Sequence, residues 1–574
     1  MIELSGIPAS PGIASGPVFR MVEQEITVDQ KSIGDPDAEI DRLDHALAKA
    51  KSQIKELKSK VEQEASADEA AIFEAHAMFL DDPALVDTAR KRVKSENINA
   101  EAALLSASEE LAKQLEAMED DYFRARAADV RDVVNRVIRI LQGVDELDLS
   151  NLDEPSIILA RDLTPSDTAR LDKELVLGFC TAEGGPTSHT AILAKALFLP
   201  AVVGVGAEIL SAKTGELMIL NGEDGTVTLD PDEEQLQASR AAQAAFKEQS
   251  EALLESASQP AVTLDGHHIE VVANVGNPSD TSLALAQGAE GIGLLRTEFL
   301  YLDRDTSPNE EEQFEAYDSI LDLMGTKPVV VRTLDVGGDK ELPYLDLGSE
   351  TNPFLGWRAI RMCLDRPDFF KIQLRALLRA SPGHDLRIMF PMIATLDEVR
   401  RSKAVLEEAR QEVIAAGHEV AEHIQVGIMV EIPAVAVQAD LFAREVDFFS
   451  IGTNDLTQYT MAAERTNEKV AHLGDATSPA ILRQIDRVIR AAHAQGIWVG
   501  LCGELAGDPN AIPVLLGLDL DEFSMSPISI PRAKDVLRAW STEDARILAE
   551  EVLDLDSGQA VRARVRERTT QVST

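Results

Sequence analysis

The feature that most constrains the fold is an alternation of strands and helices that begins at Gln259 and runs through the rest of the chain. Apolar strands that alternate with helices pair in parallel, because each helix returns the chain to the same edge of the sheet. Eight such units predict a (β/α)8 TIM barrel over residues 259–574. The predicted strands are IEVVANV, GIGLLRTEF, PVVVRTLDV, LRIMFPMI, VGIMVEIP, VDFFSIGTNDL, WVGLCGEL and EFSMSPISI.

A helical pattern precedes the barrel. Asp35-Pro36 opens it, with Asp as N-cap and Pro in the first turn. An apolar stripe at alternating spacings of three and four then predicts helix-on-helix packing, and similar patterning continues to about Leu141. We predict a helical bundle within residues 21–143. The stripe consists of Ile40, Leu43, Leu47, Ala50, Ile54, Leu57 and Val61.

Short apolar strands lie on both sides of this bundle. Residues 1–20 predict two strands around a Pro-Gly turn, and the strands SIILA, LVLGFCT, AVVGV, LMILN and TVTLD follow from Ser156. We expect residues 1–20 and 144–229 to pair into one α/β domain, into which the bundle is inserted. Residues 230–258, rich in Ala, Glu and Gln, predict a linker helix capped by Asp230-Pro231.

Composition narrows the functional classes. No apolar run approaches the ~20 residues that span a bilayer. The three cysteines lie far apart without a CxxC pair, which is typical of a reducing cytosol, so we expect a cytoplasmic protein. A net charge of −44 disfavours nucleic acids and anionic lipids and attracts basic partners. An anionic substrate would need a local cluster of arginines or lysines.

The active site of such a barrel lies where the strands end. Several arginines at one mouth imply an anion between them, because guanidinium forks match phosphate and carboxylate. Glu431 and Asp455, which end adjacent predicted strands, suit Mg²⁺. Together they predict a ligand with a phosphate and a carboxylate, set up for phosphoryl transfer. The polar residues at these ends are Asn274, Arg296, Arg332, Glu431, Asn454, Asp455, Cys502, Glu504 and Ser524, with Arg358 and Arg465 close by.

Two further residues have alternative interpretations. Cys502 ends the seventh predicted strand and is either a small core residue or a general acid. His189 follows Gly184, Gly185 and two hydroxyl residues at the start of a predicted helix, where free N–H groups favour a bound phosphate. It is either a nucleophile that becomes phosphorylated or a histidine with no catalytic role in the polar first turn of the helix.

Seven strings follow one another along the chain: GGPTSHTAILAKALFLPAVVG, GAEGIGLLRTEFLYLDRD, GGDKELPY, NPFLGWRAIR, RIMFPM, FFSIGTNDLTQYT and GLCGELAGD. Taken together and in this order, they resemble enzyme I of the bacterial phosphoenolpyruvate-dependent sugar phosphotransferase system. The resemblance runs essentially from end to end, and no single turn or packing rule would generate the whole set.

The resemblance implies a role for each matching residue. His189 would accept the phosphoryl group, Thr168 would contact it, and Cys502 would protonate the enolate. The phosphoenolpyruvate clamp would consist of Arg296, Arg332, Arg358 and Arg465 with Asn454. Mg²⁺ would bind Glu431 and Asp455.

The resemblance also implies partners. The helical bundle would dock the histidine phosphocarrier protein, with Glu69, Glu74, Met78 and Arg126 facing it. The barrel would form a homodimer. Pro186 and Gly474 depart from the family pattern, and we expect altered rates rather than a lost reaction. The alternatives are a pyruvate, phosphate dikinase or phosphoenolpyruvate synthase, which would need an ATP-binding domain that we do not find in the sequence, and a regulatory protein that senses phosphoenolpyruvate without turnover.

Overall fold

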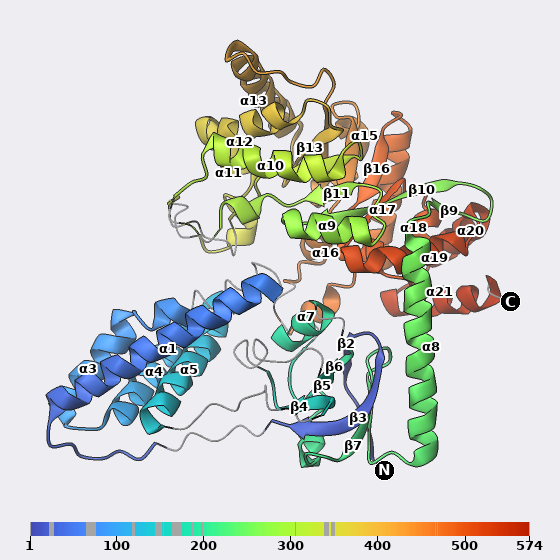
Figure 1. The fold of residues 1–574 in the computed structure, drawn as a ribbon. Helices are drawn as coiled ribbons and strands as arrows, with labels where there is room; N and C mark the ends of the chain where they lie inside the picture. The colour runs from blue at the N-terminus through green and yellow to red at the C-terminus, as the bar shows by residue number, and fades with distance from the viewer. Residues whose placement is uncertain are drawn as a thin grey trace. The chain divides into compact units, whose positions relative to one another are not determined.

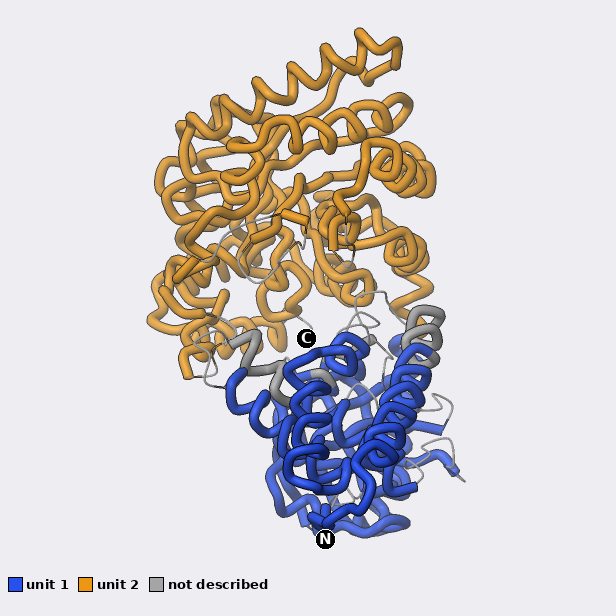
Figure 2. The backbone as a smooth tube through the Cα atoms, turned by 90° about the vertical axis from the view of Figure 1, so that its left-hand side faces the viewer, with its two compact units in different colours: residues 1–250 blue, residues 251–574 orange. Residues whose placement is uncertain are grey.

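The computed structural model divides the chain into two compact units, residues 1–250 and 251–574 (Figure 2). The finer division at residues 20, 143, 229 and 258 stays a prediction. The structure describes all residues except 1, 22–27, 65–75, 117–120, 144–151, 153, 164–174, 186–187, 197–198, 303, 305, 338–341, 343, 346–349, 465–466, 468 and 573–574. It describes only the backbone at 56–64, 116, 121–128, 189, 192, 195–196 and 572.

The first unit contains an 8-stranded mixed sheet of order β1-β8-β7-β3-β4-β5-β6-β2. Strands from the start of the chain pair with strands from after the bundle, as the sequence predicts: β1 with β8, β2 with β6, and β3 with both β4 and β7. The strands are β1 Ile2–Ser5, β2 Ile7–Ser10, β3 Ile13–Arg20, β4 Ser156–Ala160, β5 Val176–Thr181, β6 Ala201–Val203, β7 Leu217–Asn221 and β8 Thr226–Leu229. Helix α7, His189–Ala196, joins β5 to β6.

A bundle of helices is inserted between β3 and β4 (Figure 1). Asp35 accepts backbone hydrogen bonds from Asp37 and Ala38, at 3.1 and 3.2 Å, which confirms the predicted N-cap. Leu43, Leu47, Ala50 and Ile54 from the predicted stripe are buried in the bundle core. The helices are α1 Pro36–Glu64, α3 Pro83–Glu96, α4 Ala100–Glu116 and α5 Asp121–Gln142.

Helix α8, Glu233–Ala257, confirms the helix predicted after the α/β domain, but its predicted cap was wrong. Asp232 is the N-cap: its side chain accepts from the backbone N–H of Gln235 at 2.8 Å, and the Gln235 side chain accepts from the Asp232 N–H at 3.0 Å. Asp230 instead has a φ of 49° and lies outside the helix. The start of the helix is therefore set by the aspartate whose side chain bonds the third helical residue, and not by the Asp-Pro pair two residues earlier.

The second unit is the predicted barrel. Eight parallel strands run in order from β10 to β17, and β10 pairs with both β11 and β17, which closes the sheet. The strands are β10 His268–Val275, β11 Ile292–Leu295, β12 Val329–Arg332, β13 Leu386–Phe390, β14 Gln425–Val430, β15 Phe448–Ile451, β16 Trp498–Leu501 and β17 Glu522–Met525. The short strand β9, Ala261–Val262, was not predicted and pairs antiparallel with β10.

Helices join the barrel strands and close the chain. They are α9 Pro278–Ala286, α10 Glu310–Met324, α11 Ile360–Asp365, α12 Pro367–Ala380, α13 Leu396–Ala415, α14 Pro433–Val437, α15 Ala439–Phe442, α16 Thr453–Met461, α17 Pro479–His493, α18 Ile512–Gly517, α19 Ile530–Arg538, α20 Thr542–Leu553 and α21 Gly558–Val572. Most strands are shorter than the apolar strings that predicted them, because the last residues of those strings lie in loops or helices at the mouth. No helix in the described ranges combines the length and apolarity that a membrane crossing requires.

Candidate active site

The mouth of the barrel, at the carboxyl ends of its strands, gathers several of the predicted residues. Arg332 is the last residue of β12, Glu431 directly follows β14, and Cys502 directly follows β16. Asp455 lies in the first turn of α16, after β15. All four are buried, with exposed fractions of 8% or less. Charged groups are rarely buried unless they are paired, so this cluster marks a site.

One carboxylate, Asp335, joins the two buried arginines. It accepts from Arg358 Nε at 2.9 Å and from Arg358 Nη2 at 3.1 Å, a bidentate pair. Its Oδ2 also lies 3.1 Å from Arg332 Nη1. Glu298 accepts from Arg332 Nη2 at 3.0 Å and from the Asp335 backbone N–H at 3.1 Å. The guanidinium groups are thus held in fixed orientations at the mouth.

Arg358 also reaches Asp455, one of the two predicted metal ligands. Its Nη1 lies 3.4 Å from Asp455 Oδ1 and donates to the Tyr459 hydroxyl at 3.2 Å. Tyr459 in turn donates to the Phe354 carbonyl at 2.7 Å, which ties α16 to the segment before α11. The two buried arginines of the predicted clamp and one predicted metal ligand, Asp455, therefore share one network of contacts.

Glu431 lies deepest in this network and is 1% exposed. The Met392 backbone N–H donates to its Oε1 at 2.5 Å, from a residue with a φ of 53°. Burial, followed by the nearby Asp455 and Asp335 carboxylates, raises the pKa of Glu431 to about 8, against the opposing effect of Arg358 and Arg332. The site therefore carries an excess of buried acid, which a cation would relieve.

Cys502 packs in the barrel interior beside Leu294, Val330 and Met429. Its thiol lies 3.7 Å from the Ile451 carbonyl oxygen. Burial raises the pKa of Cys502 to about 11, so the sulfur holds its proton at neutral pH. This matches a proton donor as well as a core residue, so the geometry leaves both interpretations standing.

Other predicted residues surround this centre. Asn274 donates to the Cys502 carbonyl at 2.9 Å and accepts from the Ser524 hydroxyl at 2.6 Å. Asn454 accepts from the Glu504 backbone N–H at 3.4 Å. Arg296 directly follows β11 and is exposed, and the described part of the chain gives it no ion pair.

The histidine motif lies in the first unit. His189 is the first residue of α7, as predicted, and Ser188 caps that helix by accepting from the Ala191 N–H at 3.3 Å. Gly184 has a φ of 102°, a conformation that favours glycine. The His189 side chain is not among those that the structure describes. The motif thus begins a helix, and the first turn of a helix is a position that favours a bound anion.

The remaining predicted residues are only partly described. Met78, in the bundle, is 69% exposed, as a docking residue must be. Arg126 lies in α5, but its side chain is outside the description. Thr168, Arg465, Glu69, Glu74 and Pro186 lie outside the described residues.

Asp335, Glu298 and Tyr459 were not predicted from the sequence. Asp335 and Glu298 lie within the predicted strand strings PVVVRTLDV and GIGLLRTEF, near their carboxyl ends. The rule that located Arg332 and Arg296 could therefore have found both acids. Tyr459 carried no such signal, because it is placed by a turn of α16 rather than by a strand end.

Comparison with known proteins covers most of the chain. Residues 250–542 match a family described as "PEP-utilising enzyme, PEP-binding domain". Residues 5–126 match "PEP-utilising enzyme, N-terminal", and residues 152–225 match "PEP-utilising enzyme, mobile domain". The barrel centre described above thus falls inside the first match, and His189 falls inside the third.

Curated relatives match over nearly their entire length. A phosphoenolpyruvate-protein phosphotransferase of Priestia megaterium is 49% identical over 97% of this chain and 98% of its own. Proteins with the same name from Geobacillus stearothermophilus and Bacillus subtilis (strain 168) are 50% and 48% identical, over 97% and 99% of this chain and 96% and 100% of their own. The chain therefore belongs to the phosphoenolpyruvate-protein phosphotransferase family, as its resemblance to enzyme I implied.

Proposed function

We propose that the chain transfers the phosphoryl group of phosphoenolpyruvate to its own His189 and then to a histidine phosphocarrier protein. The observation that carries this proposal is the network at the barrel mouth, in which Arg332, Arg358 and two buried carboxylates meet. The arginines supply forks for a phosphate and a carboxylate, the two anionic groups of phosphoenolpyruvate. Arg296, Arg465 and Asn454 complete the proposed clamp.

Glu431 and Asp455 are the proposed ligands of a Mg²⁺ ion. Both are oxygen donors, both are buried at the ends of neighbouring strands, and their mutual repulsion favours a cation between them. When bound, the ion would neutralise phosphate charge and help align the phosphorus for in-line attack.

The chain's own groups would perform the remaining steps. The neutral His189 ring attacks the phosphorus, the bond from phosphorus to the enol oxygen breaks, and an enolate departs. Cys502 then donates its proton to the enolate carbon, which gives pyruvate. A thiol whose pKa is raised to about 11 by burial keeps that proton until the enolate forms. Thr168 is the proposed hydroxyl contact of the phosphohistidine.

The proposed carrier docks on the helical bundle. Met78 offers an exposed apolar contact, and Glu69, Glu74 and Arg126 offer charges to the carrier. The net charge of −44 favours a basic partner. We further propose a cytoplasmic homodimer that associates through the barrel.

Labelled phosphoenolpyruvate tests the proposal. The full-length chain with Mg²⁺ and without a carrier is expected to acquire an acid-labile label. His189→Ala should abolish labelling, whereas His418→Ala, which changes an exposed histidine of the barrel, should leave it intact. Label that survives in His189→Ala, or no label on the unmodified chain, would refute autophosphorylation at this residue.

A further inference from the structure

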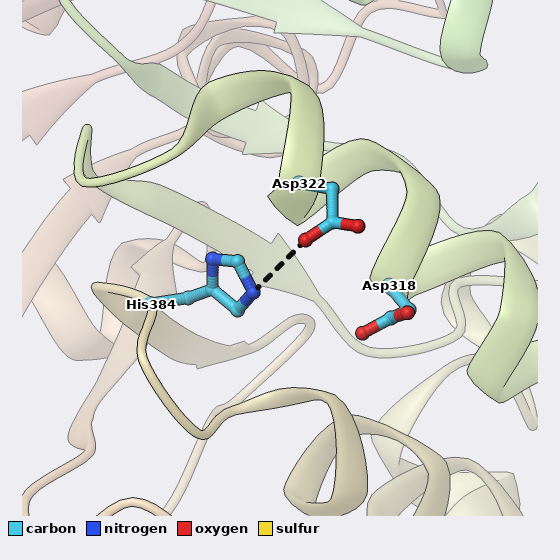
Figure 3. Close-up of side chains that lie close together, drawn as sticks. All are labelled: Asp318, Asp322 and His384. Carbon is cyan, nitrogen blue, oxygen red and sulfur yellow. Dashed lines mark ion pairs between the residues drawn. The ribbon is translucent and has the colours of Figure 1, made fainter.

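A second group of metal-ligating side chains lies in the barrel unit, away from the mouth. Asp318 and Asp322 lie one turn apart on α10, and His384 lies in the loop between α12 and β13 (Figure 3). One ligand atom from each residue lies within 4.8 Å of the other two. The side chains of Asp318 and Asp322 extend from the same side of the helix toward the imidazole (Figure 3). Spacing of i and i+4 on one helix face is a common way to present two ligands to one ion.

The His384 ring is oriented by a contact outside the group. Its Nδ1 lies 3.2 Å from the Gly325 carbonyl oxygen, which can only accept a hydrogen bond. Nδ1 must therefore carry the proton, and Nε2 faces Asp322 Oδ1 at 3.6 Å. Histidines that bind metals usually donate their other N–H to a carbonyl or carboxylate, because this fixes the ring and its tautomer. The side chain is only 14% exposed, so the ring has little freedom to turn away.

The charges around Nε2 are unbalanced. In the described ranges, neither aspartate forms an ion pair with a lysine or arginine, and Asp322 pairs with His384. A neutral Nε2 would direct its lone pair at two carboxylates that also offer only lone pairs. A metal ion at this point would accept lone pairs from all three side chains.

We propose that Asp318, Asp322 and His384 bind a divalent transition-metal ion such as Zn²⁺. One imidazole nitrogen and two carboxylate oxygens favour Zn²⁺, Co²⁺ or Mn²⁺ over Mg²⁺, which prefers oxygen ligands alone. A tetrahedral Zn²⁺ needs ligand atoms about 3.3 Å apart. Asp322 is 73% exposed and so has room to close the remaining distance. Water would fill the fourth position.

The proposed site has a structural task. α10 leads into β12 through Gly325, and His384 leads into β13, so the three ligands lie near the amino ends of these strands. This is the end of the barrel opposite Arg332 and Glu431. A bound ion would link α10 to the α12–β13 loop and stabilise the folded barrel in proportion to its occupancy.

Metal titration of the full-length chain tests the proposal. The chain is stripped with a chelator, saturated with Mg²⁺ so that the mouth is occupied, and titrated with Co²⁺ and Zn²⁺. We expect one Co²⁺ with visible absorption bands and no thiolate charge-transfer band, because all three cysteines are buried. Zn²⁺ should raise the melting midpoint progressively with its concentration.

Two variants and a control decide the outcome. Asp318→Asn and His384→Gln should each weaken Zn²⁺ binding by at least the ~10- to 100-fold that loss of an outer hydrogen bond costs. His493→Gln should not change the Zn²⁺ affinity. His493 pairs with Asp521 at 2.8 Å, but in the described part of the chain it has one acidic partner rather than two. Equal affinity in wild type and both variants would overturn the proposal.

Ring nitrogen shifts give a measurement that does not depend on a variant that folds. In the ¹⁵N-histidine spectrum of the wild-type chain, Zn²⁺ should shift one Nε2 resonance at a stoichiometry of one. If no ring shifts with Zn²⁺ and one titrates only with pH, the group is an ion pair alone and the metal site is refuted.

Discussion

At the scale of single residues, the pair of buried arginines shows how an anion site is built before its ligand arrives. Asp335 holds the Arg358 guanidinium by two hydrogen bonds and also contacts Arg332. Burial would lower the pKa of Arg358, but the Asp335 and Asp455 carboxylates raise it well above its usual value. The charge is therefore permanent, and its direction is set by the protein.

Arg358→Lys keeps the positive charge but loses the planar set of guanidinium N–H donors. An ammonium group cannot bond both Asp335 oxygens and the ligand in one plane. We expect kcat/KM for phosphoenolpyruvate to fall by about 10- to 100-fold, the equivalent of one or two charge-assisted hydrogen bonds. Arg361→Lys is the control, because Arg361 binds only the backbone carbonyls of Leu355 and Gly356 in the described structure. Equal losses in the two variants would contradict a specific role.

Glu522 permits a prediction about pH. It is 1% exposed at the start of β17, and neither carboxyl oxygen has a hydrogen-bond partner among the described residues. Burial, and then the nearby Glu270, raise its pKa from 4.5 to about 8. Between these values the folded chain binds more protons than the unfolded chain, so this residue makes stability fall as the pH rises.

Glu522→Gln removes that dependence. Between the two pKa values, the free energy of unfolding of the variant should rise relative to that of wild type by up to about 1.4 kcal/mol per pH unit. Above both pKa values the difference should stay constant. Denaturant unfolding at a series of pH values measures the difference. Glu407→Gln, at an exposed position on α13, is the control, and its stability should depend on pH as that of wild type does. The same pH dependence in Glu522→Gln and wild type would show that the Glu522 carboxyl is solvated.

The residues of the site were predictable to different degrees. Arg332, Glu431 and Cys502 were found because a parallel barrel brings its strand ends to one mouth, whichever segments lie between. The acids that hold the arginines were not found, because pairing across strands is fixed by side-chain geometry. Glu298 and Arg332 lie 34 residues apart and meet only in the closed barrel.

At the scale of elements, the period of the apolar pattern predicted every barrel strand and the helices of the bundle. Element ends were less predictable, because side chains compete to cap them. Asp232, not Asp230, is the N-cap of α8, because Asp232 and Gln235 form two reciprocal hydrogen bonds between side chain and backbone. The strand β9 was not predicted, because two residues are too few to show an alternation of apolar and polar side chains.

The carboxyl end of α8 is bound to the barrel by α19. Lys534 is 1% exposed, donates to the carbonyls of Ala257, Gln259 and Gly288 at 3.0, 3.2 and 2.8 Å, and lies 2.8 Å from Glu290 Oε1. Arg538 adds a bond to the Ser256 carbonyl at 2.9 Å. Cations at a helix carboxyl end satisfy carbonyls that the helix leaves open.

Lys534→Met should therefore destabilise the barrel by about 3–5 kcal/mol, because it leaves several carbonyls without a buried donor and leaves Glu290 with the exposed His268 as its ion-pair partner in the described structure. Thermal unfolding checks this. Arg532→Met, on the same helix, removes an exposed pair with Asp535 and should cost about 0.5 kcal/mol or less. Similar losses in both variants would show that Lys534 is not a buried anchor.

At the scale of the whole molecule, charge decides how the chain meets its partners. Its 99 acidic residues outnumber 55 basic ones. Such a surplus accelerates encounter with a basic protein and is screened by salt.

Phosphoryl transfer from the phosphorylated chain to a basic carrier should therefore slow by about tenfold between low and high ionic strength. Rapid-quench kinetics at low carrier concentration, where encounter limits the rate, measures this. Autophosphorylation in the same salt series separates encounter from chemistry. A transfer rate that does not respond to salt would show that the surplus charge lies away from the docking surface.

The anchored end of α8 makes this helix a lever arm. It has 25 residues, or about 38 Å at the usual rise per residue. With Lys534 holding one end, a tilt of about ten degrees would displace the other end by about 6 Å. Inserting one residue would also rotate everything beyond it by about 100° about the helix axis. The length of α8 therefore sets both the distance and the rotation of the segment at its far end. Insertions or deletions preserve the rotation only when they add or remove close to a whole number of helical turns.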